Sequence, residues 1–191
     1  MKYYKKFSPL FDLSNDKYDT FVLTGGRGSL KTGHAVRAVM VDMMKRKVRV
    51  CCFRETKTSQ KDSLINEFKE LANTEFAGRG FTYNSETITN VIKGSTVTFL
   101  GLRDSNANAR EALKGLSQVD IWLVDEAQAV SSAVWGVLLK TLRKKGVKLI
   151  VIYNRIEDDL PVEDALFINY DEMSAPEKTY FVEVNYPEVQ H

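Results

Sequence analysis

Residues 25–32 carry glycines, a lysine and a threonine in an order that suits phosphate binding. The stretch reads Gly25-Gly26-Arg27-Gly28-Ser29-Leu30-Lys31-Thr32. Glycines let successive backbone N–H groups curve around a polyphosphate, and the N-terminus of a following helix adds its positive dipole end. Lys31 would reach the β- and γ-phosphates, and the Thr32 hydroxyl would bind Mg²⁺. The sequence therefore predicts a phosphate-binding loop for ATP and Mg²⁺.

Leu30 departs from the pattern G-x-x-x-x-G-K-[ST], which places its second glycine at this position. If the backbone there needs a positive φ, a branched residue costs roughly 1–2 kcal/mol. If the glycine serves close approach instead, the leucine side chain must point away from the nucleotide. The surroundings support the motif, because an apolar run precedes it and an amphipathic helix follows. The apolar face of that helix comprises Ala35, Val36, Val39, Met40 and Met43.

A second motif places two carboxylates directly after an apolar run. Residues 121–124 read Ile-Trp-Leu-Val, which suits a central parallel strand that is buried on both faces. Asp125 and Glu126 follow, at the end of the strand where open α/β sheets bind ligands. Asp125 would hold Mg²⁺, and Glu126 would orient or deprotonate an attacking water. Alone, the pair could be a solvated acidic turn; combined with Lys31 and Thr32, it predicts an ATPase.

The hydrophobic pattern predicts the elements that must position these residues. Apolar runs at 21–23, 48–53, 121–124 and 149–152 indicate buried parallel strands, and residues 61–72 and 131–142 have helical periodicity. Residues 87–100 change to a strand-like period around Gly94, which indicates a β-hairpin, and 179–184 suits an edge strand. We expect an α/β fold, with a mostly parallel sheet covered by helices on both faces, plus a β-hairpin insertion.

Composition bounds the size and the environment of the protein. The 191 residues are 43% hydrophobic and 27% charged, which suits one globular domain. No apolar run approaches the ~20 residues that span a bilayer, and the N-terminus lacks the apolar core of a signal peptide. The net charge of +2 gives no overall nucleic-acid signature. The basic runs at 45–47 and 143–145 sit at predicted helix C-termini, where cations complement the dipole; DNA contact is their alternative role.

Other residues with reactive or aromatic side chains have simpler explanations. Cys51 and Cys52 are adjacent within an apolar run, which favours reduced core residues over a disulfide. His34 and His191 stand apart from any metal-ligand pattern, and we expect surface or loop positions for both. The N-terminal aromatic residues could line an adenine pocket or simply cover the sheet: Tyr3, Tyr4 and Phe7.

These motifs together resemble the ATPase domain of the bacteriophage terminase large subunit, a DNA-packaging motor. Residues 25–29 match the start of the family's G-G-R-G-S-G-K-S Walker A loop, with Leu30 as the departure. Residues 119–127 resemble its Walker B region, and residues 52–63 its second strand and following helix. Residues 149–154 resemble its coupling motif, which usually ends in F-N-P; here Arg155 replaces the proline. The resemblance implies a P-loop NTPase of the RecA-like class.

The resemblance also implies roles for individual residues. Arg27, inside the loop, would swing toward the γ-phosphate as an arginine finger does; its alternative is a salt bridge to a carboxylate. Glu126 would be the catalytic base. Asn154 would sense the γ-phosphate and relay hydrolysis to a moving element, or it would be a polar strand cap. Nucleotide contacts would come from the whole loop: Gly25, Gly26, Arg27, Gly28, Ser29, Leu30, Lys31 and Thr32, with Thr32 and Asp125 at the metal.

The resemblance implies partners as well. The family couples ATP hydrolysis to pushing double-stranded DNA into a procapsid, as a homo-oligomeric ring docked on the portal protein, together with the terminase small subunit. We expect a mostly monomeric protein in isolation, no membrane partner, and location in the host cell cytoplasm. Family members add a nuclease domain; no RNase H-like strand pattern follows the acidic residues 158, 159 and 164. Residues 1–191 then form a single ATPase domain, either excised or naturally short.

Two other functions remain open from the sequence. Leu30 and Arg155 also suit a nucleotide-binding assembly module with weak or no hydrolysis. A RecA-like helicase or recombination ATPase shares the core, but such proteins typically add further motifs that are not visible here.

Overall fold

The structure, a computed structural model, describes residues 4–54, 61–101, 116, 118–142, 144–156 and 158–185. The strands are β1 (Thr20–Thr24), β2 (Arg49–Arg54), β3 (Phe81–Tyr83), β4 (Thr87–Asn90), β5 (Ser95–Gly101), β6 (Ile121–Val124), β7 (Lys148–Ile152) and β8 (Thr179–Glu183). The α-helices are α1 (Lys31–Lys45), α2 (Lys61–Asn73), α4 (Ser132–Thr141) and α5 (Pro161–Leu166), and the short 3-10 helices are η1 (Lys5–Phe11) and η2 (Ala127–Ala129).

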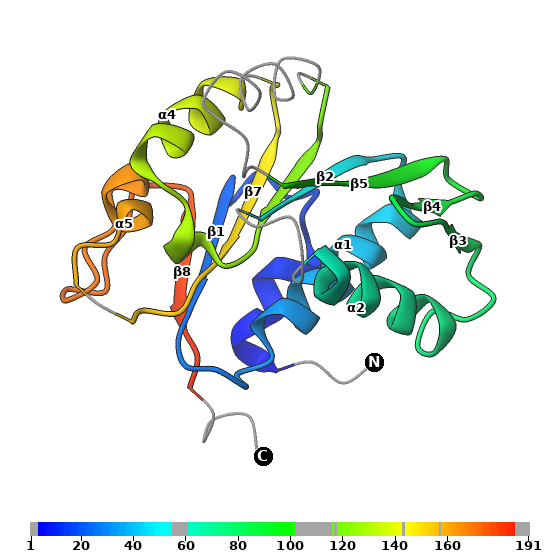
Figure 1. The fold of residues 1–191 in the computed structure, drawn as a ribbon, viewed down its shortest axis with the longest axis horizontal. Helices are drawn as coiled ribbons and strands as arrows, with labels where there is room; N and C mark the ends of the chain where they lie inside the picture. The colour runs from blue at the N-terminus through cyan, green and yellow to red at the C-terminus, as the bar shows by residue number, and fades with distance from the viewer. Residues whose placement is uncertain are drawn as a thin grey trace.

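All eight strands form one sheet in the order β3-β4-β5-β2-β6-β7-β1-β8 (Figure 1). Every pair from β5 to β8 in this order is parallel, which confirms the four predicted central strands and the predicted edge strand. The hairpin β4–β5 is antiparallel as predicted, but it extends the main sheet, because β5 pairs with β2. The three-residue strand β3, which is too short to show a period, adds a further antiparallel edge strand.

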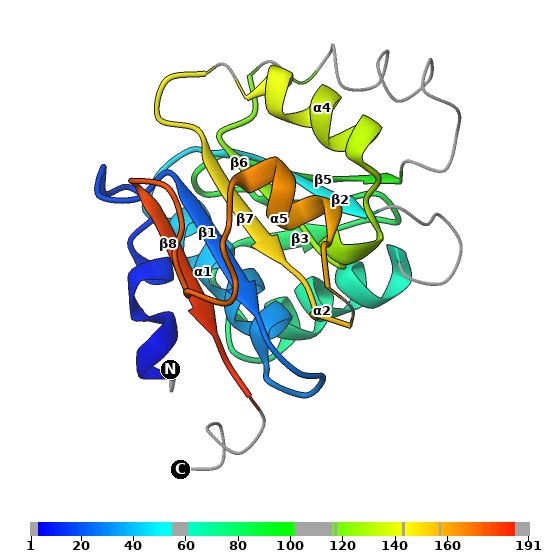
Figure 2. The ribbon, with the colours of Figure 1, turned by 90° about the vertical axis from the view of Figure 1, so that its left-hand side faces the viewer.

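Helices cover both faces of the sheet, as the apolar strands require. One core lies beneath η1, α1 and α2, and the other lies beneath α4 and α5 (Figures 1 and 2). All residues of β6 and β7 are buried, because side chains on both faces of these strands pack against helices. The fold is therefore the α/β class that the sequence predicts.

Residues around His34 correct one expectation and bear on a second. His34 is only 5% exposed, so the prediction of a surface or loop histidine was wrong. Its burial is tolerated because Nδ1 lies 2.9 Å from the Leu30 carbonyl and Nε2 accepts the Tyr4 N–H at 3.2 Å. Phe7 is fully buried in the core and stacks on His34 of α1 at 4.3 Å, which favours a packing role over the alternative of lining an adenine pocket.

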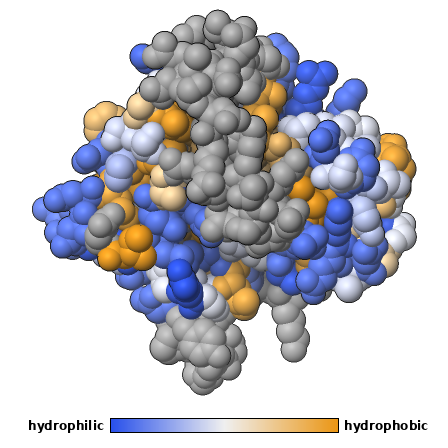
Figure 3. All heavy atoms as spheres, in the orientation of Figure 1, coloured by the Kyte–Doolittle hydropathy of each residue, from blue (hydrophilic) through white to orange (hydrophobic). Residues whose placement is uncertain are grey.

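Cys51 and Cys52 are core residues without a disulfide, as predicted. Each is buried in one of the two cores. On the coloured part of the face in Figure 3, several separate hydrophobic patches lie among hydrophilic residues. Among the described residues, no helix is both long and apolar enough to cross a bilayer. Tyr3, Arg143 and His191 lie outside the described residues.

The topology brings three loops to one place. β6, β7 and β1 are neighbours in the sheet, and all three run in the same direction. The glycine-rich loop follows β1, the acidic pair follows β6, and Asn154 follows β7. The C-terminal edge of the sheet is therefore where the predicted site residues meet.

Candidate nucleotide-binding site

The glycine-rich loop needs glycine at its first position. Gly25 has φ 128°, and a Cβ atom there would overlap the Val184 carbonyl of the neighbouring β8 segment. Gly28 also has a positive φ, of 77°. The Ser29 hydroxyl closes the loop by donating to the Gly26 carbonyl at 2.8 Å. The loop is thus held in a curved conformation immediately before α1.

Leu30 adopts the backbone conformation that a glycine would serve. Its φ of 58° and ψ of 17° lie in the left-handed region, and it caps the N-terminus of α1. Its side chain is exposed, with 54% of its surface accessible. The departure from the motif therefore stores strain of about 1–2 kcal/mol in the loop.

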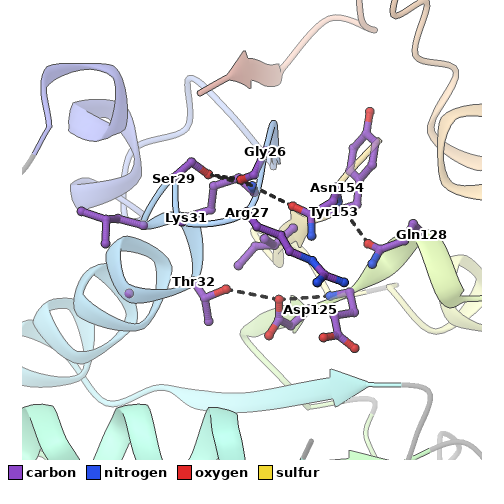
Figure 4. A pocket seen from close by; sticks show the side chains of 14 residues that line it. Gly26, Arg27, Ser29, Lys31, Thr32, Asp125, Gln128, Tyr153 and Asn154 are labelled. Atoms are coloured by element: carbon purple, nitrogen blue, oxygen red, sulfur yellow. Dashed lines mark hydrogen bonds between the residues drawn. The ribbon is translucent and has the colours of Figure 1, made fainter. Parts of the chain in front are cut away.

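Lys31 points back into the loop rather than out to solvent. Its Nζ lies 2.9 Å from the carbonyl oxygens of both Gly25 and Gly26, and 2.8 Å from the Ser29 hydroxyl. It also donates to Asn154 Oδ1 at 3.0 Å (Figure 4). Burial lowers the pKa of Lys31 to about 8, although the negative charge of Asp125 partly opposes this shift. The ammonium thus occupies the centre of the loop, where phosphate oxygens can replace its present acceptors.

Thr32 and Asp125 lie side by side and suit a small divalent cation. Thr32 Oγ1 is 3.3 Å from Asp125 Oδ1, and Asp125 is 4% exposed. A hydroxyl and a carboxylate are the hard oxygen ligands that Mg²⁺ prefers, and two protein ligands leave positions for water and phosphate oxygens. Within the described parts of the chain, no cluster of three or more His, Cys, Asp or Glu residues forms another metal site. The donor set fits Mg²⁺.

Glu126 lies next to this pair in an unusual backbone conformation. Its φ of 53° and ψ of 42° are left-handed, and its N–H donates to Asp125 Oδ1 at 3.0 Å. Strained backbone of this kind persists where the surrounding structure determines it, and it clusters at functional sites. The conformation turns the chain sharply after β6, so that Glu126 faces the pocket instead of extending the strand.

One pocket of about 420 Å³ unites the predicted residues. Its lining includes every predicted site residue except Gly25, which lies at the base of the loop against β8. The Arg27 side chain reaches across the pocket toward Asp125 (Figure 4). The volume lies within the range of small-molecule sites, and the lining combines loop N–H groups, two cations and two carboxylates. This set can bind a polyphosphate and place a carboxylate beside a water molecule.

Comparison with known proteins identifies the family of the chain. A family model of phage terminase large subunits matches residues 17–188. The chain belongs to the phage terminase large subunit family. No curated protein matches the chain.

Solved terminases share the fold of this terminase chain. The large terminase of a thermophilic bacteriophage has a TM-score of 0.76 at 14% identity, covering 96% of this chain and 46% of that one. The HK97 bacteriophage large terminase has a TM-score of 0.73 at 12% identity, covering 95% and 39%. The ATPase domain of the Thermus phage P74-26 large terminase has a TM-score of 0.63 at 12% identity, covering 97% and 80%. The chain thus spans less than half of the first two terminases.

Gln128 is a pocket residue of this terminase that sequence reasoning missed. It lies in η2, and its Oε1 accepts the backbone N–H of Asn154 at 3.2 Å. Asn154 therefore contacts the Walker B loop through its backbone and Lys31 through its side chain. The available signal was position alone, since Gln128 closely follows the acidic pair at the C-terminal edge of the sheet.

Proposed function

We propose that this chain is an ATP-hydrolysing motor domain of a phage DNA-packaging terminase. The observation that carries the proposal is the convergence of two pairs in one pocket: Lys31 with Asn154, and Thr32 with Asp125. Each pair joins the phosphate-binding loop to the end of a different strand. An ATPase requires that the residues that bind the phosphates lie close to those that position Mg²⁺ and the attacking water.

In the proposed reaction, the phosphates of ATP displace the loop carbonyls from Lys31, whose charge then faces the β- and γ-phosphates. Thr32 and Asp125 would hold Mg²⁺, which neutralises phosphate charge when it is bound. Glu126 accepts the proton of the attacking water as general base. Arg27 moves from its position across the pocket to stabilise charge that develops on the γ-phosphoryl oxygens.

We further propose that hydrolysis drives movement of double-stranded DNA into a procapsid. Asn154 would report the state of the γ-phosphate through its bond with Lys31. The large terminase of the thermophilic bacteriophage has been solved with ADP and with ATP-gamma-S, and the Phi-28 gp11 DNA packaging motor shares this fold. We propose DNA, the portal protein and a terminase small subunit as partners, with a ring forming on the procapsid and mostly monomers elsewhere.

ATP turnover by the protein, measured with and without double-stranded DNA and with and without Mg²⁺, tests this function. We expect slow Mg²⁺-dependent turnover that rises with protein concentration or on addition of portal-bearing capsids. Nucleotide binding with no turnover under any of these conditions would instead favour an assembly module, the function that the strained Leu30 and the substitution Arg155 also suit.

A further inference from the structure

Arg155 follows Asn154 directly, and side chains outside the nucleotide pocket hold its guanidinium group. The Cζ atom lies over the Tyr170 ring, 4.1 Å from its centre, which is a cation–π contact. One nitrogen lies 3.0 Å from Asp158, and Nε lies 3.4 Å from the Glu163 carboxylate. The side chain is only 22% exposed. Arg155 is therefore packed in place, unlike a surface arginine that is free to move.

Two partners of Arg155, Glu163 and Tyr170, are themselves anchored to the fold. Glu163, in α5, is 7% exposed and accepts the Tyr153 hydroxyl at 3.0 Å. The Tyr170 hydroxyl donates to Glu183 of β8 at 2.6 Å. Burial and the Glu183 carboxylate raise the pKa of Tyr170 to about 12, so its hydroxyl stays protonated and remains a donor. The residues on both sides of Asn154 are thus fixed to the sequence segment 158–183.

This segment returns to the phosphate-binding loop. Just beyond β8, the Val184 N–H donates to the Thr24 carbonyl at 2.9 Å. The Asn185 side chain then accepts the Gly26 N–H at 3.2 Å. A closed chain of contacts therefore runs from the loop through Lys31 and Asn154 to Arg155, Tyr170 and β8, and back to the loop.

We propose that Arg155 is a positioning residue that fixes Asn154 against Lys31 and joins the nucleotide site to segment 158–183. The inference rests on the proposed function, because Lys31 must release Asn154 when it turns to a bound phosphate. With Arg155 in place, the movement of Asn154 on its release is transmitted to Tyr170 and β8. Without the Arg155 contacts, that movement would stay confined to Asn154. A proline at this position would restrict the chain through its ring; here the side chain of Arg155 restricts it through contacts with other elements.

The direct test is hydrogen exchange of the full chain with and without ATP-gamma-S. We compare the parent, Arg155→Ala, and Arg155→Lys, which keeps the charge but loses the planar stacking group. Arg37→Ala is the matched control, since it removes an arginine ion pair, with Glu75 at 2.7 Å, outside this chain of contacts. In the parent and in Arg37→Ala, nucleotide should slow exchange in the phosphate-binding loop and change exchange in segment 158–183. In Arg155→Ala, nucleotide should still slow exchange in the phosphate-binding loop but should no longer change exchange in segment 158–183. In Arg155→Lys, the change in segment 158–183 should be partly retained.

Turnover gives a second readout. Arg155→Ala should lower turnover about tenfold while ATP-gamma-S affinity stays within about threefold, because a misplaced group slows chemistry more than binding. The double variant Arg155→Ala with Asn154→Ala should lose no more turnover than Asn154→Ala alone, since Arg155 acts through Asn154. Additive losses, or an unchanged segment response in Arg155→Ala, would overturn the proposal. No loop response to nucleotide in the parent would contradict the proposed function itself, and this inference with it.

Discussion

Replacing Leu30 with glycine or alanine separates backbone strain from side-chain packing in the phosphate-binding loop. Both variants lose the leucine side chain, so they differ mainly in how they tolerate φ 58°. Relief of left-handed strain favours glycine by roughly 1–2 kcal/mol. The greater freedom of glycine in the unfolded chain opposes this by roughly 0.5–1 kcal/mol. We therefore expect Leu30→Gly to be about 1 kcal/mol more stable than Leu30→Ala, or about 2–4 °C in Tm.

Thermal and urea unfolding of the two variants measure this difference. Gly78→Ala is the calibrating control, because Gly78 has φ 73° and open space where a Cβ would lie. It should lose about 1 kcal/mol for the same reason. Leu30→Gly should also keep or improve nucleotide affinity relative to the parent. An alanine variant as stable as the glycine variant, or a large loss of ATP affinity in Leu30→Gly, would refute the reasoning.

Three further expectations concern the site and its surroundings. The pKa of Lys31 is about 8, and phosphate binding needs the charged form, so ATP affinity measured by calorimetry should fall roughly tenfold between pH 7 and pH 9. Lys31→Ala should weaken ATP binding and remove this pH dependence. Burial lowers the pKa of His34, so as the pH falls the unfolded chain binds a proton at a higher pH than the folded chain does. The free energy of unfolding should therefore fall as pH drops below about 6.5. In denaturant titrations at pH 5 and 7.5, His34→Gln should reduce this dependence on pH. Sedimentation over a concentration series should show mostly monomer, since weak polar interfaces need a symmetric scaffold to raise the local concentration; a stable ring at low concentration would contradict this.

The central sheet could be predicted because its strands carry their own signal. Four and five successive buried residues in β6 and β7 reflect burial on both faces, and the turn at Gly94 marks the hairpin. β3 and α5 contain only three and six residues, so neither gives a readable period. The position of β3 in the sheet depends on the pairing of β5 with β2, and the position of α5 depends on its packing against α4. Local sequence encodes neither of these contacts.

The site was predictable to the extent that its residues belong to contiguous motifs. The loop and the acidic pair follow their strands directly, so topology alone brings them together. Gln128 has no motif, and its role appears only when η2 is placed beside the end of β7. His34 was misjudged because its burial depends on acceptor and donor groups supplied by the Leu30 carbonyl and the Tyr4 N–H. The contacts of Arg155 span the chain from Asp158 to Tyr170, beyond any local pattern.

Glu126→Gln tests the central claim most directly, because it changes one pocket carboxylate to an amide of the same shape. We measure steady-state ATP turnover and ATP-gamma-S affinity for the parent and for this variant, in the same buffer with Mg²⁺. Loss of a general base should lower turnover by roughly 10²–10⁴-fold while affinity stays within a few-fold. An ATPase with this mechanism should therefore bind nucleotide and stall. Turnover by Glu126→Gln at the parental rate would contradict the account.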